Sequence, residues 1–106
     1  MPKYLVRASY TAAGAAGLLK DGGRGRTQAI TKLVESGGGS VESIYWAMGD
    51  DDIIIICDAP DAMAVAAVSL NVGASGAARC STSELLTSDQ MDEVAERQIT
   101  YRAPGA

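Results

Sequence analysis

Histidine is absent from this chain of 106 residues. Histidine is the side chain that most often serves as a general base near neutral pH, and it is a frequent ligand of haem and of transition metals. Its absence excludes a Ser-His-Asp or Cys-His catalytic arrangement. Few soft ligands remain, and both cysteines are expected in strands. We therefore expect no haem and no transition metal, and the sequence implies no other cofactor and assigns no catalytic residue.

Phenylalanine is also missing, and aromatic residues make up only 5% of the chain. The core must therefore consist mainly of alanine, valine, isoleucine and leucine, whose small side chains allow helices to lie close to a sheet. A chain of this length is near the commonest size of a single domain and buries enough surface for one core. We expect one domain over residues 1–98 and a flexible tail over residues 99–106.

Basic residues are scarce as well. Nine lysines and arginines stand against thirteen acidic residues, a formal net charge of -4, whereas a nucleic-acid interface needs a basic face. No apolar run approaches the ~20 residues of a membrane span, and residues 1–7 lack the apolar region of a signal peptide. Cys57 and Cys80 are too few to frame a secreted module and are expected to be unbridged thiols. These features predict a cytoplasmic protein without nucleic-acid or membrane partners.

Hydrophobic periodicity and capping residues predict the order of the elements. Strands are expected over residues 3–10, 40–48, 52–57 and 77–86, with the middle two forming a hairpin. A first helix runs over 12–20 after a Thr11 cap, is interrupted at 21–23 and resumes at about Thr27. A second helix starts at Asp58 or Ala59 with Pro60 in its first turn, and a capping box at Thr87 opens a short final helix. This order predicts an α+β, ferredoxin-like βαββαβ fold with a four-stranded antiparallel sheet, helices on one face and an extra C-terminal helix.

Four consecutive isoleucines make the expected third strand apolar on both of its faces. Because side chains alternate along a strand, Ile53 and Ile55 face one way and Ile54 and Ile56 face the other. A strand of this kind must be covered on both faces, and the helices supply only one cover. The sequence therefore predicts that a second copy or a ligand covers the other face, and we expect at least a homodimer.

Several short motifs give the chain a family resemblance over residues 3 to about 95. They are Tyr10-Thr11 with Gly14, Arg26, Gly38-Gly39, Gly49 with Asp52, Ala59-Pro60-Asp61, Ser75-Gly76, and Thr82 with Leu85-Leu86-Thr87. In this combination the chain resembles the GYD domain family, small bacterial proteins grouped with the dimeric α+β barrel superfamily. The Gly-x-Tyr-Asp signature reads Gly49-Asp50-Asp51-Asp52 here, so a role that needs a phenol at this hairpin is absent. The resemblance implies a fold and an oligomer, and relatives in the superfamily include cofactor-free monooxygenases, lactone isomerases and haem enzymes.

The strongest candidate for ligand binding is the glycine-rich break in the first helix, which carries Lys20, Arg24 and Arg26. Glycines let backbone N–H groups turn toward one point, and the start of a helix favours an anion. Two guanidinium groups can grip a carboxylate or phosphate. The alternative is a solvated loop whose cations pair with nearby acids. Arg26 is the first choice because it also matches the family's arginine.

Other polar and aromatic residues have both a structural and a functional interpretation. Asp50, Asp51 and Asp52 form either a polar hairpin tip or a site for a hard cation. Arg7, in the middle of a strand, either pairs with Glu42 or lines a pocket. Tyr45 and Trp46 lie on opposite faces of their strand, and Tyr10 and Trp46 are candidates to line a ligand pocket.

Two functions remain open. In the first, the protein binds a small anionic or quinone-like molecule between helices and sheet. In the second, it is a non-catalytic assembly or regulatory module whose apolar sheet face serves for association. A buried cavity with an ordered ligand favours the first hypothesis, and a cavity filled by side chains favours the second.

Overall fold

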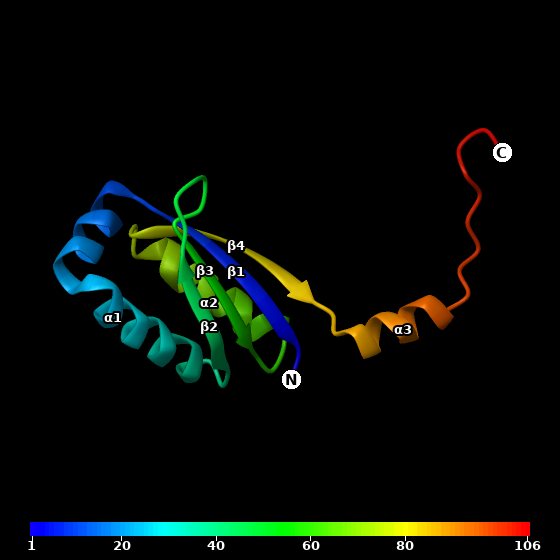
Figure 1. Cartoon of the computed structure of the whole chain (residues 1–106), viewed down its shortest axis with the longest axis horizontal. Helices are drawn as coiled ribbons and strands as arrows, with labels where there is room; N and C mark the ends of the chain where they lie inside the picture. Colours follow the sequence, from blue (N-terminus) through cyan, green and yellow to red (C-terminus); the bar gives the residue numbers. More distant parts are fainter.

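A single four-stranded antiparallel sheet organises the computed structural model, which describes residues 1–106 (Figure 1). The strands lie in the order β2-β3-β1-β4. The elements follow one another as β1 (Lys3–Tyr10), α1 (Ala12–Ser36), β2 (Ser40–Trp46), β3 (Ile53–Asp58), α2 (Ala62–Ala74), β4 (Ala78–Leu85) and α3 (Ser88–Glu96). This is the ferredoxin-like βαββαβ arrangement with an added C-terminal helix, and it confirms the fold class expected from the sequence.

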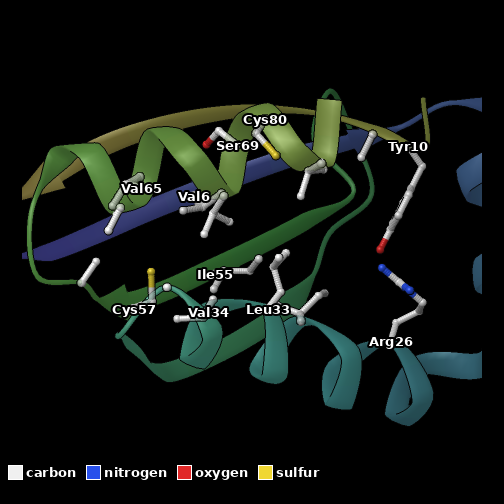
Figure 2. A pocket seen from close by; sticks show the side chains of 17 residues that line it. Val6, Tyr10, Arg26, Leu33, Val34, Ile55, Cys57, Val65, Ser69 and Cys80 are labelled. Carbon is white, nitrogen blue, oxygen red and sulfur yellow. The ribbon is translucent and has the colours of Figure 1, made fainter. Parts of the chain in front are cut away.

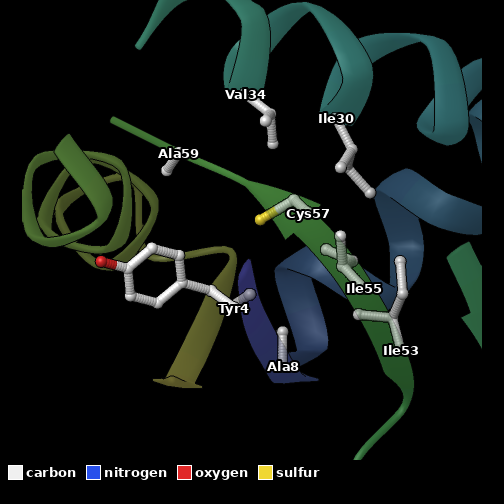
Figure 3. Close-up of a cluster of buried hydrophobic side chains, with 9 residues drawn as sticks. Tyr4, Ala8, Ile30, Val34, Ile53, Ile55, Cys57 and Ala59 are labelled. Atoms are coloured by element: carbon white, nitrogen blue, oxygen red, sulfur yellow. The ribbon is translucent and has the colours of Figure 1, made fainter. Parts of the chain in front are cut away.

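The sheet has one face packed against helices and one face without a cover in this chain. On the helix side, Ile53 and Ile55 are buried, and Val34 and Ile30 of α1 pack onto the same cluster (Figure 3). Ile53 is only 1% exposed and is the most deeply buried large side chain. The alternation expected for the isoleucine run is therefore confirmed, because burial alternates along β3.

The uncovered face carries the other half of the isoleucine run. Leu5 pairs with Ile56 in the β1–β3 register, and Tyr45 of β2 pairs with Ile54. Cross-strand partners in an antiparallel sheet project to the same side, so these four side chains form one apolar group. We call the group formed by Leu5, Tyr45, Ile54 and Ile56 the open-face patch. Tyr45 is 69% exposed in the single chain.

Helix α1 differs from the prediction in its middle. The expected glycine-rich loop up to Thr27 is wrong, because the chain is helical from Ala12 to Ser36 with a single non-helical residue, Gly22. Gly22 has φ 74° and ψ 169°, a conformation that glycine adopts without a Cβ clash. One such residue suffices to kink the helix, so the residues after it belong to the first turn of a second helical segment.

The start of α1 is fixed to the β4 side of the sheet. Thr11 caps the helix as expected, and its hydroxyl accepts a hydrogen bond of 3.2 Å from the Gly14 amide. The same hydroxyl donates to the Gly76 carbonyl at 2.7 Å. A Cβ placed on Gly14 would lie 1.9 Å from the carbonyl oxygen of Ala77, so only glycine allows the helix to approach the chain this closely.

Helix α2 begins later than the sequence suggested. Its N-cap is Asp61, whose side chain accepts a hydrogen bond of 2.9 Å from the Ala64 amide. The predicted cap at Asp58 or Ala59 is wrong because Asp58 still belongs to β3 and Ala59 is buried in the core. Pro60 therefore lies before the helix and not in its first turn.

The C-terminal segment projects away from the sheet. Figure 1 shows α3 and the residues after it extending from the end of β4, far from α1 and α2. The predicted capping box of α3 is present between Thr87 and Gln90. Every residue from 86 to 106 is exposed in the single chain. None of the helices combines the length and the apolar character needed to cross a bilayer.

Candidate functional site

An elongated cavity lies between the two helices and the helix-facing side of the sheet (Figure 2). It has a volume of about 80 Å³, several times the ~10–15 Å³ that one water molecule requires by this kind of measure. Fourteen of its seventeen lining residues are hydrophobic. We call this space the interhelical cavity, and its walls include Val6 of β1, Ile55 of β3, Leu33 of α1 and Val65 of α2.

The cavity exists because the two helices cover different parts of the sheet. Helix α2 packs over β4 at one edge, and α1 packs over β2 at the other. The central strands β1 and β3 are left between them, and their small or branched side chains do not fill the space. Figure 2 shows α1 and α2 on opposite sides of the cavity, with side chains from both pointing into it.

One end of the interhelical cavity is polar. Tyr10, at the end of β1, and Arg26, on α1, both line it. Figure 2 shows the Tyr10 hydroxyl and the Arg26 guanidinium pointing toward each other across this end. Arg26 also lies 3.7 Å from a carboxylate oxygen of Asp21, and its side chain is 32% exposed. This ion pair is long and open to solvent, so the guanidinium retains donors for a ligand.

Aromatic stacking holds Tyr10 in place. The Tyr10 and Trp46 rings stack with centroids 6.2 Å apart and an interplanar angle of 16°. Trp46 shares the helix-facing side with Ile53, its cross-strand partner, whereas Tyr45 lies on the open face. The predicted separation of these two aromatic residues is therefore confirmed.

A carboxylate of the β2–β3 hairpin also positions Tyr10, and the sequence did not indicate this role. Asp52 accepts a hydrogen bond of 2.7 Å from the Tyr10 amide, and its own amide donates to the Ala8 carbonyl at 2.9 Å. Asp52 was expected only as part of a polar tip or a cation site. No group of three or more acidic or cysteine side chains in this structure is arranged to hold a metal ion. The spacing between Tyr10 and Asp52 along the chain is too long for a local motif to indicate the contact.

The other two cations of the glycine-rich segment lie away from this end. Arg24 is exposed and does not line the cavity. Two positions along a helix differ by about 200° around its axis, since one turn takes 3.6 residues, so Arg24 and Arg26 project from opposite sides of α1. Lys20 is exposed and precedes the kink at Gly22. The structure thus does not bring Lys20, Arg24 and Arg26 together around one point.

Arg7 lies on the opposite side of the sheet from Tyr10 and Arg26. Its cross-strand partner is Ile54, so it projects from the open face beside the open-face patch. The expected Arg7–Glu42 pair is wrong. Arg7 approaches Asp51 at 4.0 Å, and Glu42 pairs with Lys3 at 3.2 Å. A one-residue bulge in β2 after Val41 changes the strand's register and places Glu42 beside Lys3.

Two cysteines line the interhelical cavity and were not predicted as part of a site. Both thiols are free, with Cys57 buried and Cys80 half-buried. Burial raises the pKa of each thiol above its ordinary value, because a thiolate is poorly solvated there. The thiols are therefore protonated and slow to react near neutral pH, which makes them probes of access to the cavity.

Fold and cavity together define a ferredoxin-like α+β domain with a pocket between its helices and its sheet. The model of the GYD domain matches residues 4–95. Because the match covers most of the chain, the protein belongs to the GYD domain family, as the resemblance implied. No curated protein and no solved structure gives a significant match.

Proposed function

We propose that this protein binds a small molecule in the interhelical cavity, with Arg26 and Tyr10 contacting the polar group of the ligand. The observation that supports the proposal is an apolar cavity with one cation and one phenol at the same end. A few convergent polar groups in an otherwise apolar pocket are typical of ligand sites. An anionic or quinone-like group suits this end, because a guanidinium donates hydrogen bonds to a carboxylate or a carbonyl oxygen.

The two cavity thiols allow a direct test. Protein purified without added ligand is examined by native mass spectrometry, and any adduct is released by denaturation and identified. The same sample is treated with a thiol reagent before and after release. We expect an adduct, and faster modification of Cys57 and Cys80 once it has been removed. Absence of an adduct, together with no protection of the thiols by any of a panel of organic anions, quinones and alkyl compounds, would contradict the proposal.

Two arginines on α1 provide a matched comparison for the polar end. Arg26→Ala removes the cation that lines the cavity, and Arg24→Ala removes one on the other side of the helix. A bidentate contact from arginine to a charged group contributes about 1.5–3 kcal/mol. We therefore expect Arg26→Ala to weaken binding of the released ligand roughly ten- to a hundredfold, and Arg24→Ala to leave it unchanged. Equal effects of both substitutions on ligand affinity would show that Arg26 does not contact the ligand.

We further propose that the protein functions as a homodimer or larger homo-oligomer joined through the open sheet face. The open-face patch supports this, since Ile54 and Ile56 gain no cover from either helix of their own chain. Adjacent isoleucines give the test: Ile54→Asp places a charge on the open face, and Ile53→Asp places one in the core. We expect Ile54→Asp to yield a folded species of 10.9 kDa in sedimentation, and Ile53→Asp to prevent folding. A wild-type monomer at micromolar concentration would refute the assembly.

The alternative function is a non-catalytic assembly or regulatory module. The open-face patch favours it, because association alone would explain those residues. The two functions differ in the cavity: the alternative predicts that no small molecule copurifies and that none protects the cavity thiols. A cytoplasmic location is also proposed, and the two unbridged cysteines are consistent with it.

A further inference from the structure

The charge and shape of the interhelical cavity restrict the class of ligand beyond the proposal above, on which this inference rests. Among the lining residues Arg26 is the only charged one, and Tyr10 is the only aromatic one. No carboxylate lines the cavity. A ligand that uses this cavity fully therefore carries one acceptor or negative group at one end and no charge along the rest of its length.

The apolar part of the cavity is long and aliphatic. Cys57, near the far end, pairs with Tyr4 in the β1–β3 register, and Tyr10 at the polar end is six residues further along β1. At about 3.3 Å per strand residue, the distance between these levels is roughly 20 Å. Figure 2 shows Val6, Ile55 and Val34 between the two ends, and Val65 with Cys57 at the end remote from Arg26.

The wall chemistry favours a flexible chain over a flat ring system. Branched aliphatic side chains and alanines surround the space along its length, and Ser69 is the only aliphatic hydroxyl among them. A planar aromatic ligand would gain from stacking partners, but the one lining ring, Tyr10, already stacks on Trp46. An alkyl chain needs no such partner and gains affinity with each methylene that leaves water.

We propose that the ligand is a single-chain amphiphile, an unbranched alkyl chain with a terminal carboxylate. The carboxylate accepts hydrogen bonds from Arg26 and the Tyr10 hydroxyl, and the chain runs between α1 and α2 along β1 and β3 toward Cys57. An extended alkyl chain advances about 1.3 Å per carbon, since its C–C bonds are about 1.5 Å long. A chain of about ten to twelve carbons spans roughly 13–16 Å and therefore fits within the roughly 20 Å between the two ends.

The test compares four probes by calorimetry on the delipidated full-length protein. Decanoate carries both features, 1-decanol keeps the chain without the charge, hexanoate keeps the charge with a shorter chain, and 1-naphthoate is a compact aromatic anion. We expect decanoate to bind best. Each additional buried methylene should raise affinity about fourfold until the cavity is filled, so decanoate, with four more methylenes, should exceed hexanoate by roughly two hundredfold. Trp46 fluorescence reports occupancy of the polar end independently, because Trp46 stacks on Tyr10.

Three variants assign the two ends. Arg26→Gln should reduce decanoate affinity roughly ten- to a hundredfold and leave decanol binding unchanged. Lys32→Gln removes an exposed cation from the same helix and should change neither. Val65→Phe should shorten the cavity at the end remote from Arg26, so that decanoate loses affinity and hexanoate does not. Circular dichroism and sedimentation confirm that each variant keeps its fold and assembly.

The outcomes separate this inference from the proposed function. Stronger binding of 1-naphthoate than of decanoate would overturn the amphiphile while leaving a ligand-binding protein. Equal binding of decanoate and decanol, or an equal loss of both in Arg26→Gln, would overturn the carboxylate contact. If no probe binds and no small molecule copurifies or protects the thiols, the proposed function itself fails.

Discussion

Substitution of Gly14 by alanine tests how α1 is attached to the rest of the domain. The built Cβ would lie 1.9 Å from the Ala77 carbonyl oxygen and 2.7 Å from the Tyr10 ring, whereas atoms in ordinary contact are about 3.5–4.0 Å apart. The first turn of α1 must therefore move by more than 1 Å. Backbone on one side and a stacked ring on the other leave it no free direction, so the shift should disturb the contacts around Thr11.

The cost follows from the contacts at that turn. The Thr11 cap contributes about 1 kcal/mol. The Thr11 amide donates to Ala77 at 3.0 Å and the hydroxyl to Gly76 at 2.7 Å, and each bond contributes about 0.5–1.5 kcal/mol. The total of about 3 kcal/mol is reduced by about 1 kcal/mol, because alanine is a better helix former than glycine. We expect the free energy of unfolding to fall by about 2 kcal/mol.

Gly17 provides the matched control on the same helix. Its built Cβ meets nothing within 4 Å, and its φ is not positive, so Gly17→Ala should stabilise the protein by about 0.5–1 kcal/mol. Both variants are compared with wild type by urea unfolding at one protein concentration, because assembly makes stability concentration-dependent. The reasoning is refuted if Gly14→Ala unfolds at the same urea concentration as Gly17→Ala, or at a higher one.

Three further predictions concern the kink in α1, the buried Cys57 thiol and Tyr4 phenol, and the C-terminal segment. Gly22→Ala should lower the free energy of unfolding by about 1–2 kcal/mol, because Gly22 has a φ of 74°. Gly23→Ala should avoid this penalty, since its Cβ would meet Trp46 at an ordinary 3.7 Å. Equal urea midpoints for the two variants would contradict the assignment of the kink to Gly22. Burial raises the pKa of the Cys57 thiol and that of the Tyr4 phenol above their ordinary values. Their contribution to stability should therefore be complete below the ordinary pKa values and decline as pH rises through the native ones. Urea titrations between pH 7 and 10.5 should show this decline in stability, and a smaller decline in Cys57→Val. An identical decline in the two proteins would exclude the Cys57 thiol as a cause. Deleting residues 87–106 should leave the urea midpoint nearly unchanged, because those residues are exposed in the single chain. A large fall in the urea midpoint would instead show that α3 packs on another copy.

The strands could be predicted because their signal is local. Alternation along the isoleucine run gave the two faces of β3, and the glycines around 37–39 separated α1 from β2. Caps formed by side chains within three residues, at Thr11 and Thr87, were also predictable. The cap of α2 was misplaced because Pro60 is favourable both in a first helical turn and just before a helix, and only the sheet register shows that Asp58 belongs to β3.

The candidate site was less predictable because it depends on direction and distance. Three glycines and two arginines within residues 22–26 resemble a loop, yet a single positive φ at Gly22 accounts for the break. Once the segment is helical, Arg24 and Arg26 project to opposite sides, and no local pattern distinguishes this case from a loop. Arg7 likewise seemed available to a pocket until the register placed it on the open face. Tyr10 and Arg26 line the same end of the cavity, whereas Trp46, also a candidate to line it, does not line it and stacks on Tyr10.

Asp52 connects the hairpin, the sheet and the interhelical cavity. Its carboxylate holds the Tyr10 amide, and its amide and carbonyl bond to Ala8 and Ala47, so the β2–β3 hairpin is closed against the end of β1. Thr11, the residue after Tyr10, caps the start of α1. The kink at Gly22 then directs Arg26 back toward Tyr10. Asp52 thus has a structural role at this hairpin that does not need a tyrosine at the position of Asp51. Because this acid positions the backbone of Tyr10, the Tyr10 side of the polar end depends on a hydrogen bond between residues 42 positions apart in the sequence.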